Sequence, residues 1–360
     1  MTAPTQRPSP RTAKAVCRCG CSSWAPWRCS ARDSPWRCSA SGAGVAAERA
    51  PVSAPTTGRD AAALLAVVPA GLLGVGLAWL LARPDPAPVA GVVRVLADCA
   101  GATVLGLAAL PRLHDRLRPP WLALAVLGGV WWVAEGAVLL FEAADVVGVP
   151  VGELDPRRFG TYLTGVSGGQ IGVAVLVGTA VLTGYAALAY RRGDDPSPDL
   201  VLVFAAVALA LRPVTGHMSQ QPLGSILAAV HALAAGTWFG VLVALALVVR
   251  GRREWAATLP RYSALAVPLV AVVGVTGIVN GLIRLGGLTA LLDTGYGRIL
   301  LAKATLLAVL LALGWWWRRD WVRRAADHRM DAAASLRRAV LEVAVMAVAF
   351  GLAAVLAVTA

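Results

Sequence analysis

The sequence predicts an all-α, polytopic transmembrane helix bundle of about nine spans, with its N-terminus inside the cell and its C-terminus outside. Hydrophobic residues make up 58% of the 360 residues and charged residues only 15%, and the mean hydropathy is +0.67. A soluble domain contains about 25% charged residues. The low charge content therefore excludes a conventional soluble enzyme or binding domain.

Nine apolar runs approach or exceed the length that an α-helix needs to cross a bilayer, which is about 20 residues. Proline, glycine and charged residues separate these runs and mark their ends. We expect spans at about 61–82, 89–110, 121–143, 166–190, 200–216, 223–249, 262–283, 299–317 and 339–358.

Arginine-rich loops follow every second span, which predicts the orientation by the positive-inside rule. The net charge of +13 is thereby explained by membrane orientation, and no nucleic-acid partner is expected. In this orientation His217 and Met218 lie on the outer face, with His231 a turn or two below it. The loop arginines are Arg112, Arg116, Arg118, Arg191, Arg192, Arg250, Arg252, Arg253, Arg318, Arg319, Arg323, Arg324 and Arg329.

The chain divides into a leader at 1–60, amino-terminal membrane helices at 61–211 and a carboxy-terminal membrane region at 212–358. The leader is basic and rich in Cys, Trp and Arg, and it lacks the apolar periodicity that a core requires. We expect it to be disordered, or to be absent if translation starts at Val45 or Val52. A metal-binding tail is the other interpretation, because Cys17-x-Cys19-x-Cys21 offers thiolates to Cu(I).

Two of the four histidines lie close to the start of the sixth predicted span. His217 is followed by Met218, and His231 lies fourteen residues further on. An imidazole beside a thioether suits copper better than zinc, calcium or magnesium. The alternative is that both histidines are hydrogen-bonded side chains at the membrane interface.

Ionisable residues inside the predicted spans form a second group of candidates, because charges in hydrocarbon are costly and face a partner or an aqueous cavity. Asp98, Glu135 and Glu142 lie in spans two and three, and Arg298 and Lys303 lie at the start of span eight. We expect ion pairs between these cations and carboxylates in the outer half of the bundle. The pairs either fix the helix packing or line a polar path for a cation.

Other polar and aromatic residues are assigned supporting roles. Trp238 shares a helix face with the histidine seven residues before it, where it closes a pocket or simply packs. Asp293 and Tyr296 lie in the loop before span eight, where they complete an outer vestibule or anchor the interface. Glu342 follows Arg338 by four residues near the inner end of the last span, and we expect these two to pair.

Several motifs resemble the copper resistance protein D family. Tyr296-Gly297-Arg298 followed by Lys303 is the clearest, and the resemblance is specific over about 212–358 and weaker over 61–211. The other similar stretches are His231-Ala-Leu-Ala-Ala-Gly-Thr-Trp238-Phe-Gly240, Arg261-Tyr-Ser-Ala-Leu-Ala, Val275-Thr276-Gly277-Ile278 and Leu336-Arg337-Arg338-Ala-Val-Leu-Glu342.

The resemblance implies a multi-pass protein of the cytoplasmic membrane that moves copper, with import favoured. It also implies partners, namely a periplasmic or extracellular copper chaperone or a cytochrome oxidase assembly factor. Actinobacterial members are often fused to an oxidase copper-assembly domain, and this chain stops at Ala360, where such a domain would begin.

Two other functions stay open beside copper transport. His217 and His231 on adjacent helices suit the axial positions of one haem b in an electron-transfer protein. A metal-free scaffold for oxidase copper-site assembly is the second alternative. No enzyme is expected, because the chain contains no His-Glu-x-x-His motif, phosphate-binding glycine loop or Ser/His/Asp set.

Overall fold

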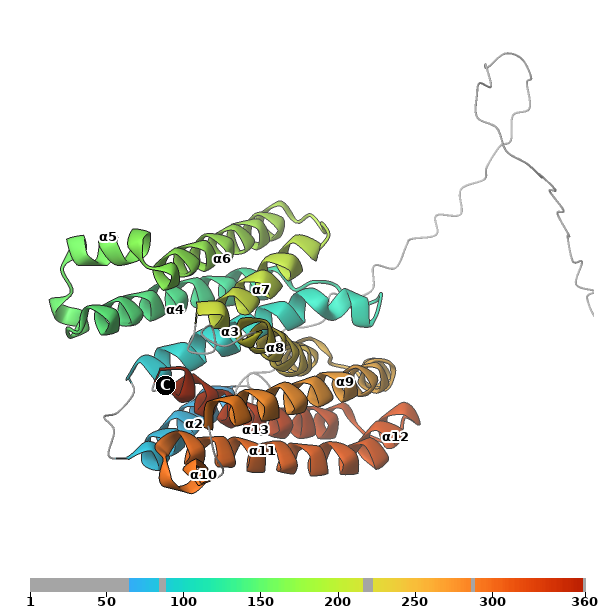
Figure 1. Cartoon of the computed structure of the whole chain (residues 1–360). Helices are drawn as coiled ribbons and strands as arrows, with labels where there is room; N and C mark the ends of the chain where they lie inside the picture. Colours follow the sequence, from blue (N-terminus) through green and yellow to red (C-terminus); the bar gives the residue numbers. More distant parts are fainter. Residues whose placement is uncertain (1–64, 84–88, 216–222, 286–288, 359–360) are drawn as a thin grey trace, which may run out of the picture. The chain divides into compact units, whose positions relative to one another are not determined.

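The computed structural model describes residues 65–83, 89–215, 223–285 and 289–358, and these residues form helices and turns without a strand (Figure 1). The long helices α3, α8 and α13 form the centre of the bundle. In chain order the elements are α2 (Val67–Ala82), α3 (Val89–Leu113), α4 (Trp121–Val147), η1 (Val151–Glu153), α5 (Pro156–Gly165), α6 (Ser167–Arg192), α7 (Asp199–Leu211), η2 (Arg212–Thr215), α8 (Gly224–Val248), α9 (Arg252–Leu285), α10 (Ala290–Asp293), α11 (Gly295–Arg319), α12 (Trp321–Ala326) and α13 (Ala332–Val358).

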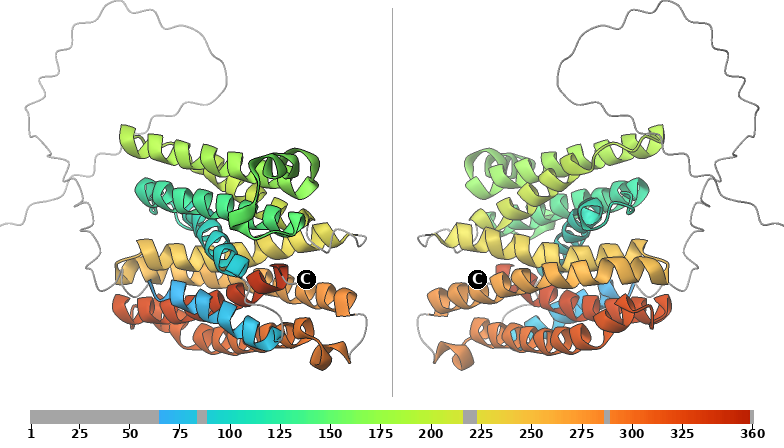
Figure 2. Two further views of the ribbon diagram at one scale, coloured as in Figure 1. Left: turned by 90° about the vertical axis from the view of Figure 1, so that its left-hand side faces the viewer. Right: turned by 90° about the vertical axis from the view of Figure 1, so that its right-hand side faces the viewer.

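Helix α3 is the central element of the fold. It packs against α4 and α7 on one side and against α8, α13 and α2 on the other. Most of its side chains between Ala97 and Leu110 are buried. Helices α6 and α11 lie on opposite faces of the bundle in all three ribbon views (Figures 1 and 2). The bundle therefore consists of a buried helix surrounded by helices that each expose one apolar face.

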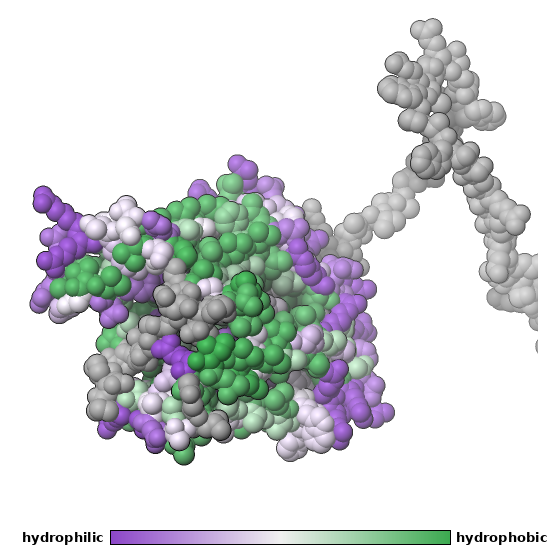
Figure 3. All heavy atoms as spheres, in the orientation of Figure 1, coloured by the Kyte–Doolittle hydropathy of each residue, from purple (hydrophilic) through white to green (hydrophobic). Residues whose placement is uncertain are grey.

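The two ends of the bundle differ from its middle in polarity. Hydrophilic residues gather at both ends of the helices, and a hydrophobic band lies between them (Figure 3). Seven of the described helices are long and apolar enough to cross a membrane: α3, α4, α6, α8, α9, α11 and α13. The predicted all-α, polytopic membrane bundle is confirmed. The number of spans and the orientation stay predictions.

Successive helices reverse direction, so the loops collect at two ends. We call the end with α5, α10 and the last turn of α13 the α5 end, and the opposite end, with α12, the α12 end (Figure 1). All the loop arginines used to predict the orientation lie at the α12 end. The positive-inside rule would place that end in the cytoplasm.

Several helices differ in length from the predicted spans. Helix α7 has 13 residues and so extends about 20 Å, less than the ~30 Å of a hydrocarbon core. It continues as a 3₁₀ turn because Pro213 has no amide hydrogen to donate. Helix α9 begins at Arg252, ten residues before the predicted start, because its first turns bury Trp255 and Leu259 near α12.

Glycines allow two pairs of helices to touch backbone to backbone. A Cβ atom on Gly240 of α8 would lie 1.8 Å from the Ala102 carbonyl oxygen of α3, and one on Gly106 would lie 2.0 Å from Gly240. In the same way, a Cβ on Gly74 of α2 would lie 2.2 Å from the Val348 carbonyl oxygen of α13. Small residues at such crossings are typical of membrane helix pairs, where close contact replaces the hydrophobic effect.

Candidate functional site

His231 lies in the second turn of α8 and points at α9. Its Nδ1 atom lies 2.9 Å from the Thr276 hydroxyl oxygen. The ring also lies beside Gly277, where a Cβ would be 3.5 Å from His231 Cε1, in ordinary contact. The adjacent residues Thr276 and Gly277 thus form the side of the bundle that His231 faces.

The Thr276 hydroxyl favours the tautomer in which Nδ1 of His231 carries the hydrogen. It lies 2.6 Å from the Val272 carbonyl oxygen, and a carbonyl only accepts. A threonine hydroxyl has a single hydrogen, so its oxygen must accept the hydrogen of His231 Nδ1. The Nε2 atom of the neutral ring then has a free lone pair. An imidazole nitrogen in this state is the form that binds a metal ion.

Lys303 of α11 is the charged residue whose field reaches His231. Within the described part of the chain, its ammonium group forms no ion pair with Asp98, Glu135 or Glu142. The expected pairing between Lys303 and these carboxylates is therefore wrong. The reason is topological, because α11 packs mainly on α2, α9 and α13, whereas the carboxylates lie on α3 and α4.

His217 and Met218 lie outside the described residues. A hydrogen bond connects the elements on either side of them, η2 and α8: the Ser225 hydroxyl donates to the Val214 carbonyl oxygen at 2.9 Å. Both flanking elements, η2 and the start of α8, lie at the α5 end of the bundle. Among the described residues no group of three or more His, Cys, Asp and Glu side chains could hold a metal ion.

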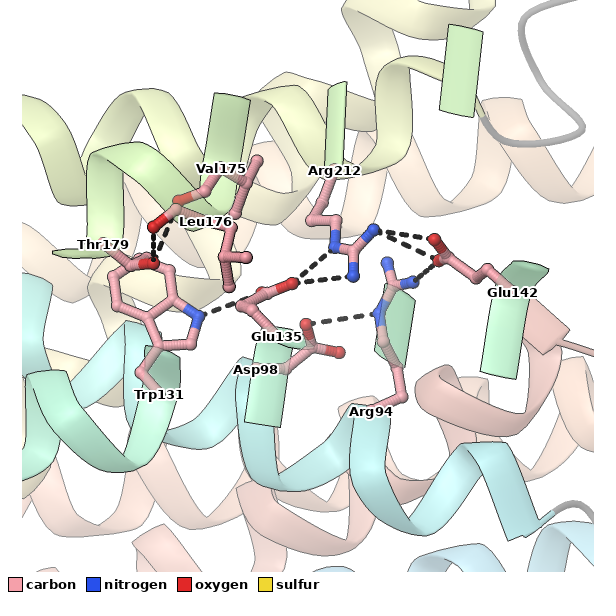
Figure 4. A network of polar contacts seen from close by, with 9 residues as sticks. All are labelled: Arg94, Asp98, Trp131, Glu135, Glu142, Val175, Leu176, Thr179 and Arg212. Atoms are coloured by element: carbon pink, nitrogen blue, oxygen red, sulfur yellow. Dashed lines mark hydrogen bonds and ion pairs between the residues drawn. The ribbon is translucent and has the colours of Figure 1, made fainter. Parts of the chain in front are cut away.

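A cluster of five charged residues lies between α3, α4 and η2 at the α5 end (Figure 4). Arg212 is its centre: its Nε donates to Glu135 Oε2 at 2.8 Å, and its Nη1 lies 2.9 Å from Glu142 Oε2. Arg94 lies 3.3 Å from Glu142 and 3.5 Å from Asp98. These three carboxylates thus pair with Arg94 and Arg212.

Burial raises the desolvation cost of this charge cluster and also strengthens the attraction between its paired charges. Arg212 is 8% and Glu135 4% exposed, and Trp131 donates its indole hydrogen to the second Glu135 oxygen at 3.0 Å. Buried ions of this kind are stable only when every charge has a partner. Two guanidinium groups face three carboxylates, so the fully ionised cluster carries a net charge of −1. Asp98 and Glu142 keep 25% and 30% of their side-chain surface exposed.

Helix α5 covers this region from outside the membrane-spanning helices. Asp155 caps its start by accepting from the Arg157 amide, and Tyr162 of the same helix is buried at 4% exposure against Leu139 and Ala143 of α4. Burial and the nearby Glu142 carboxylate raise the pKa of Tyr162 to about 12. The hydroxyl therefore stays protonated at physiological pH, and the cluster gains no further charge from it.

Arg298 has a different role from the one that the sequence suggested. Its guanidinium donates to the carbonyl oxygens of Leu81, Arg83 and Leu292, at distances of 2.8, 3.2 and 3.4 Å. It therefore fixes the end of α2 to the start of α11, and the expected ion pair of Arg298 with a carboxylate is wrong. Tyr296 packs its ring under the Arg284 guanidinium, 4.9 Å away.

The two other vestibule candidates lie apart from each other. Asp293 ends α10 and is exposed to solvent. Trp238 is buried at 7% exposure on the same face of α8 as His231.

Two parts of the chain match known families. Residues 84–222 match the family described as Copper resistance protein D-like, N-terminal domain, and residues 256–356 match Copper resistance protein D. The chain belongs to the copper resistance protein D family. No solved structure matches it.

Two curated relatives share the family name or a related one. The chain is 29% identical over 124 residues to the copper transport protein CutJ of Bacillus subtilis (strain 168), covering 31% of this chain and 23% of that protein. It is 28% identical over 163 residues to copper resistance protein D of Pseudomonas syringae pv. tomato, covering 40% of this chain and 52% of that protein. The matched parts thus span about a quarter and about half the length of these relatives.

The site residues are spread over both matched segments of the chain. The charge cluster, His217 and Met218 lie in the segment that matches the N-terminal domain. Thr276, Lys303 and Glu342 lie in the carboxy-terminal match, and His231 lies between the two. Sequence reasoning missed Arg212 entirely. Its signal was present, since it is an arginine followed by a proline at the end of an otherwise apolar run.

Proposed function

We propose that the chain is a multi-pass protein of the cytoplasmic membrane that moves copper ions inward and is not an enzyme. One observation carries the assignment of the site: inside the bundle of a copper resistance family member, Nδ1 of His231 lies 2.9 Å from the Thr276 hydroxyl, and the tautomer that donates to this hydroxyl leaves the Nε2 lone pair for a metal ion. An imidazole nitrogen is a suitable copper ligand in either oxidation state. The names of both relatives, which refer to copper transport and copper resistance, support the same cargo.

The charge cluster supports capture of a cation at the α5 end. When all five groups are ionised, its net charge of −1 would attract a cation toward η2, which begins five residues before His217. In this proposal His217 and Met218 bind copper, as Cu(I), at the outer face and pass it to His231. Carboxylates are hard ligands and do not select copper, so selectivity rests on the histidines and the methionine.

Copper accumulation in cells tests the assignment. We expect His231→Ala and His217→Ala to reduce accumulation to the level of cells without the protein, because each removes a proposed ligand. His328→Ala is the matched control, since that histidine lies exposed at the α12 end. Unchanged accumulation in both variants at normal expression would rule out the site. An absorption spectrum with a Soret band would instead favour the haem alternative, and purified protein without any metal would favour the scaffold.

The Thr276 contact gives a second test of the same site. We expect Thr276→Val to weaken Cu(I) binding about 10–100-fold, the usual effect of losing a hydrogen bond that orients a metal-binding histidine. Thr276→Ser keeps the hydroxyl and should bind nearly as tightly as the unmodified protein. Competition titration with a Cu(I) chelator measures both affinities. If valine and serine have equal effects, the hydroxyl does not orient the ligand.

A further inference from the structure

Glu342 lies in the middle of α13 and is buried at 7% exposure. The expected partner, Arg338, instead forms an ion pair with Asp320, with 3.0 Å between Arg338 Nη1 and Asp320 Oδ2. The predicted pair of Arg338 with Glu342 is therefore wrong. Among the described residues, no lysine, arginine or histidine lies within ion-pair distance of the Glu342 carboxyl group. The bundle thus contains a buried acid without a cation.

The groups around Glu342 come from two other helices. The Tyr262 hydroxyl of α9 lies beside the carboxyl group, and the Trp238 indole of α8 lies beside the same hydroxyl. Tyr262 is 4% exposed, and its hydroxyl has no hydrogen bond of standard geometry with a described residue. The buried Tyr262 hydroxyl therefore lies beside a buried acid and has no hydrogen-bond partner of standard geometry. Such groups are costly unless a ligand or a proton completes them.

The position of this cluster in the bundle is well inside the apolar band. Glu342, Tyr262 and Trp238 each lie ten residues from the α12 end of their own helix, which corresponds to about 15 Å along the axis. Arg338, one turn nearer the α12 end, is held by Asp320, which also pairs with Arg324. An ionised Glu342 would therefore need a mobile cation as its partner, because burying an unpaired charge costs several kcal/mol.

A soft ligand lies one turn away on the same helix. Met346 follows Glu342 by four residues on the buried stripe of α13 and is 2% exposed. Residues four apart in a helix lie on one face, about one turn from each other. A carboxylate alone favours hard cations, whereas an added thioether favours Cu(I).

We propose that Glu342 and Met346 form an inner copper site, with the Tyr262 hydroxyl as the polar neighbour of the carboxylate. The proposal rests on the copper transport proposed above and adds a second binding position on the inward path. His231 and Trp238 share a face of α8 and are seven residues apart, about 10 Å along the axis. Copper that leaves His231 along this face reaches the cluster of Trp238, Tyr262 and Glu342 next.

Copper stoichiometry of the purified full chain tests the inner site. The probe is Cu(I) added under anaerobic, reducing conditions, and the bound metal is measured after desalting. We expect Glu342→Gln and Met346→Leu each to bind about one copper ion fewer than the unmodified protein. Met330→Leu, at a buried methionine near α12, is the matched control and should bind the full amount. Every variant keeps the leader cysteines, so their contribution cancels in the difference.

The outcomes separate the inner site from the proposed function. If Glu342→Gln and Met346→Leu bind as much copper as the unmodified protein while His231→Ala loses one ion, the inner site is wrong and the transport proposal stands. If His231→Ala also binds the full amount, His231 is not a copper ligand and the site assigned under the proposed function fails as well. Glu342→Gln keeps the size and the polar contact with Tyr262, so it should fold. Normal elution in size-exclusion chromatography checks this.

Discussion

Replacing Arg212 by alanine should destabilise the protein by about 3–5 kcal/mol, the cost of removing one partner from a buried ion pair. The reason is that Glu135 is 4% exposed and would keep only the Trp131 indole as a partner. Glu142 would lose one of its two guanidinium partners but keep Arg94. Thermal unfolding of the purified protein in detergent, followed by tryptophan fluorescence, measures the effect.

An exposed ion pair provides the matched control. Arg112 lies only 2.6 Å from Asp199, yet the two side chains are 53% and 61% exposed. Arg112→Ala should therefore cost less than about 1 kcal/mol. Adding Glu135→Leu to Arg212→Ala should restore much of the stability, since it removes the Glu135 carboxylate that the first substitution leaves without an ion-pair partner. Equal losses for Arg112→Ala and Arg212→Ala would show that burial does not strengthen the cluster.

Gly240→Leu should prevent the protein from folding. The Cβ atom alone would lie 1.8 Å from the Ala102 carbonyl oxygen, so α3 and α8 would have to separate. These two helices form one of the most extensive contacts of the bundle, and interiors tolerate such overpacking poorly. Expression as a fluorescent fusion and size-exclusion chromatography should show aggregated protein and no symmetric peak.

Gly184→Leu serves as the control for this substitution. It places the same side chain in the middle of α6, where a Cβ meets no atom within 4 Å. A membrane-facing leucine at this position should leave expression and elution unchanged. A normal elution profile for Gly240→Leu would mean that α3 and α8 do not touch as closely as described.

The helices of this fold follow directly from the amino-acid sequence, because backbone groups in hydrocarbon must bond within their own helix. Each predicted apolar run corresponds to a described helix, from α2 to α13. The predicted spans differ from the observed helices mainly at their ends. Hydropathy does not detect that the polar start of α9 packs under α12, nor that α5 lies between two spans as an amphipathic helix.

The partners of the buried charges could not be predicted in the same way. The sequence shows that Asp98, Glu135 and Glu142 lie in spans, but pairing depends on which helices pack together. Arg212 reaches both glutamates because the short α7 ends beside α3 and α4. Likewise, a spacing of four residues favours a pair of Arg338 with Glu342, yet the competing carboxylate Asp320 is closer in space.

The glycine contact between α3 and α8 also limits where an ion can travel. Where Gly106 meets Gly240, no side chain, and therefore no ligand or water, fits between the two backbones. The α3 side of α8 is thus a sealed wall at mid-depth. His231, Trp238 and the neighbours of Glu342 all lie on the side of α8 that faces α9 and α13. In the proposed transport, a route along α8 runs on that side, between α8, α9 and α13.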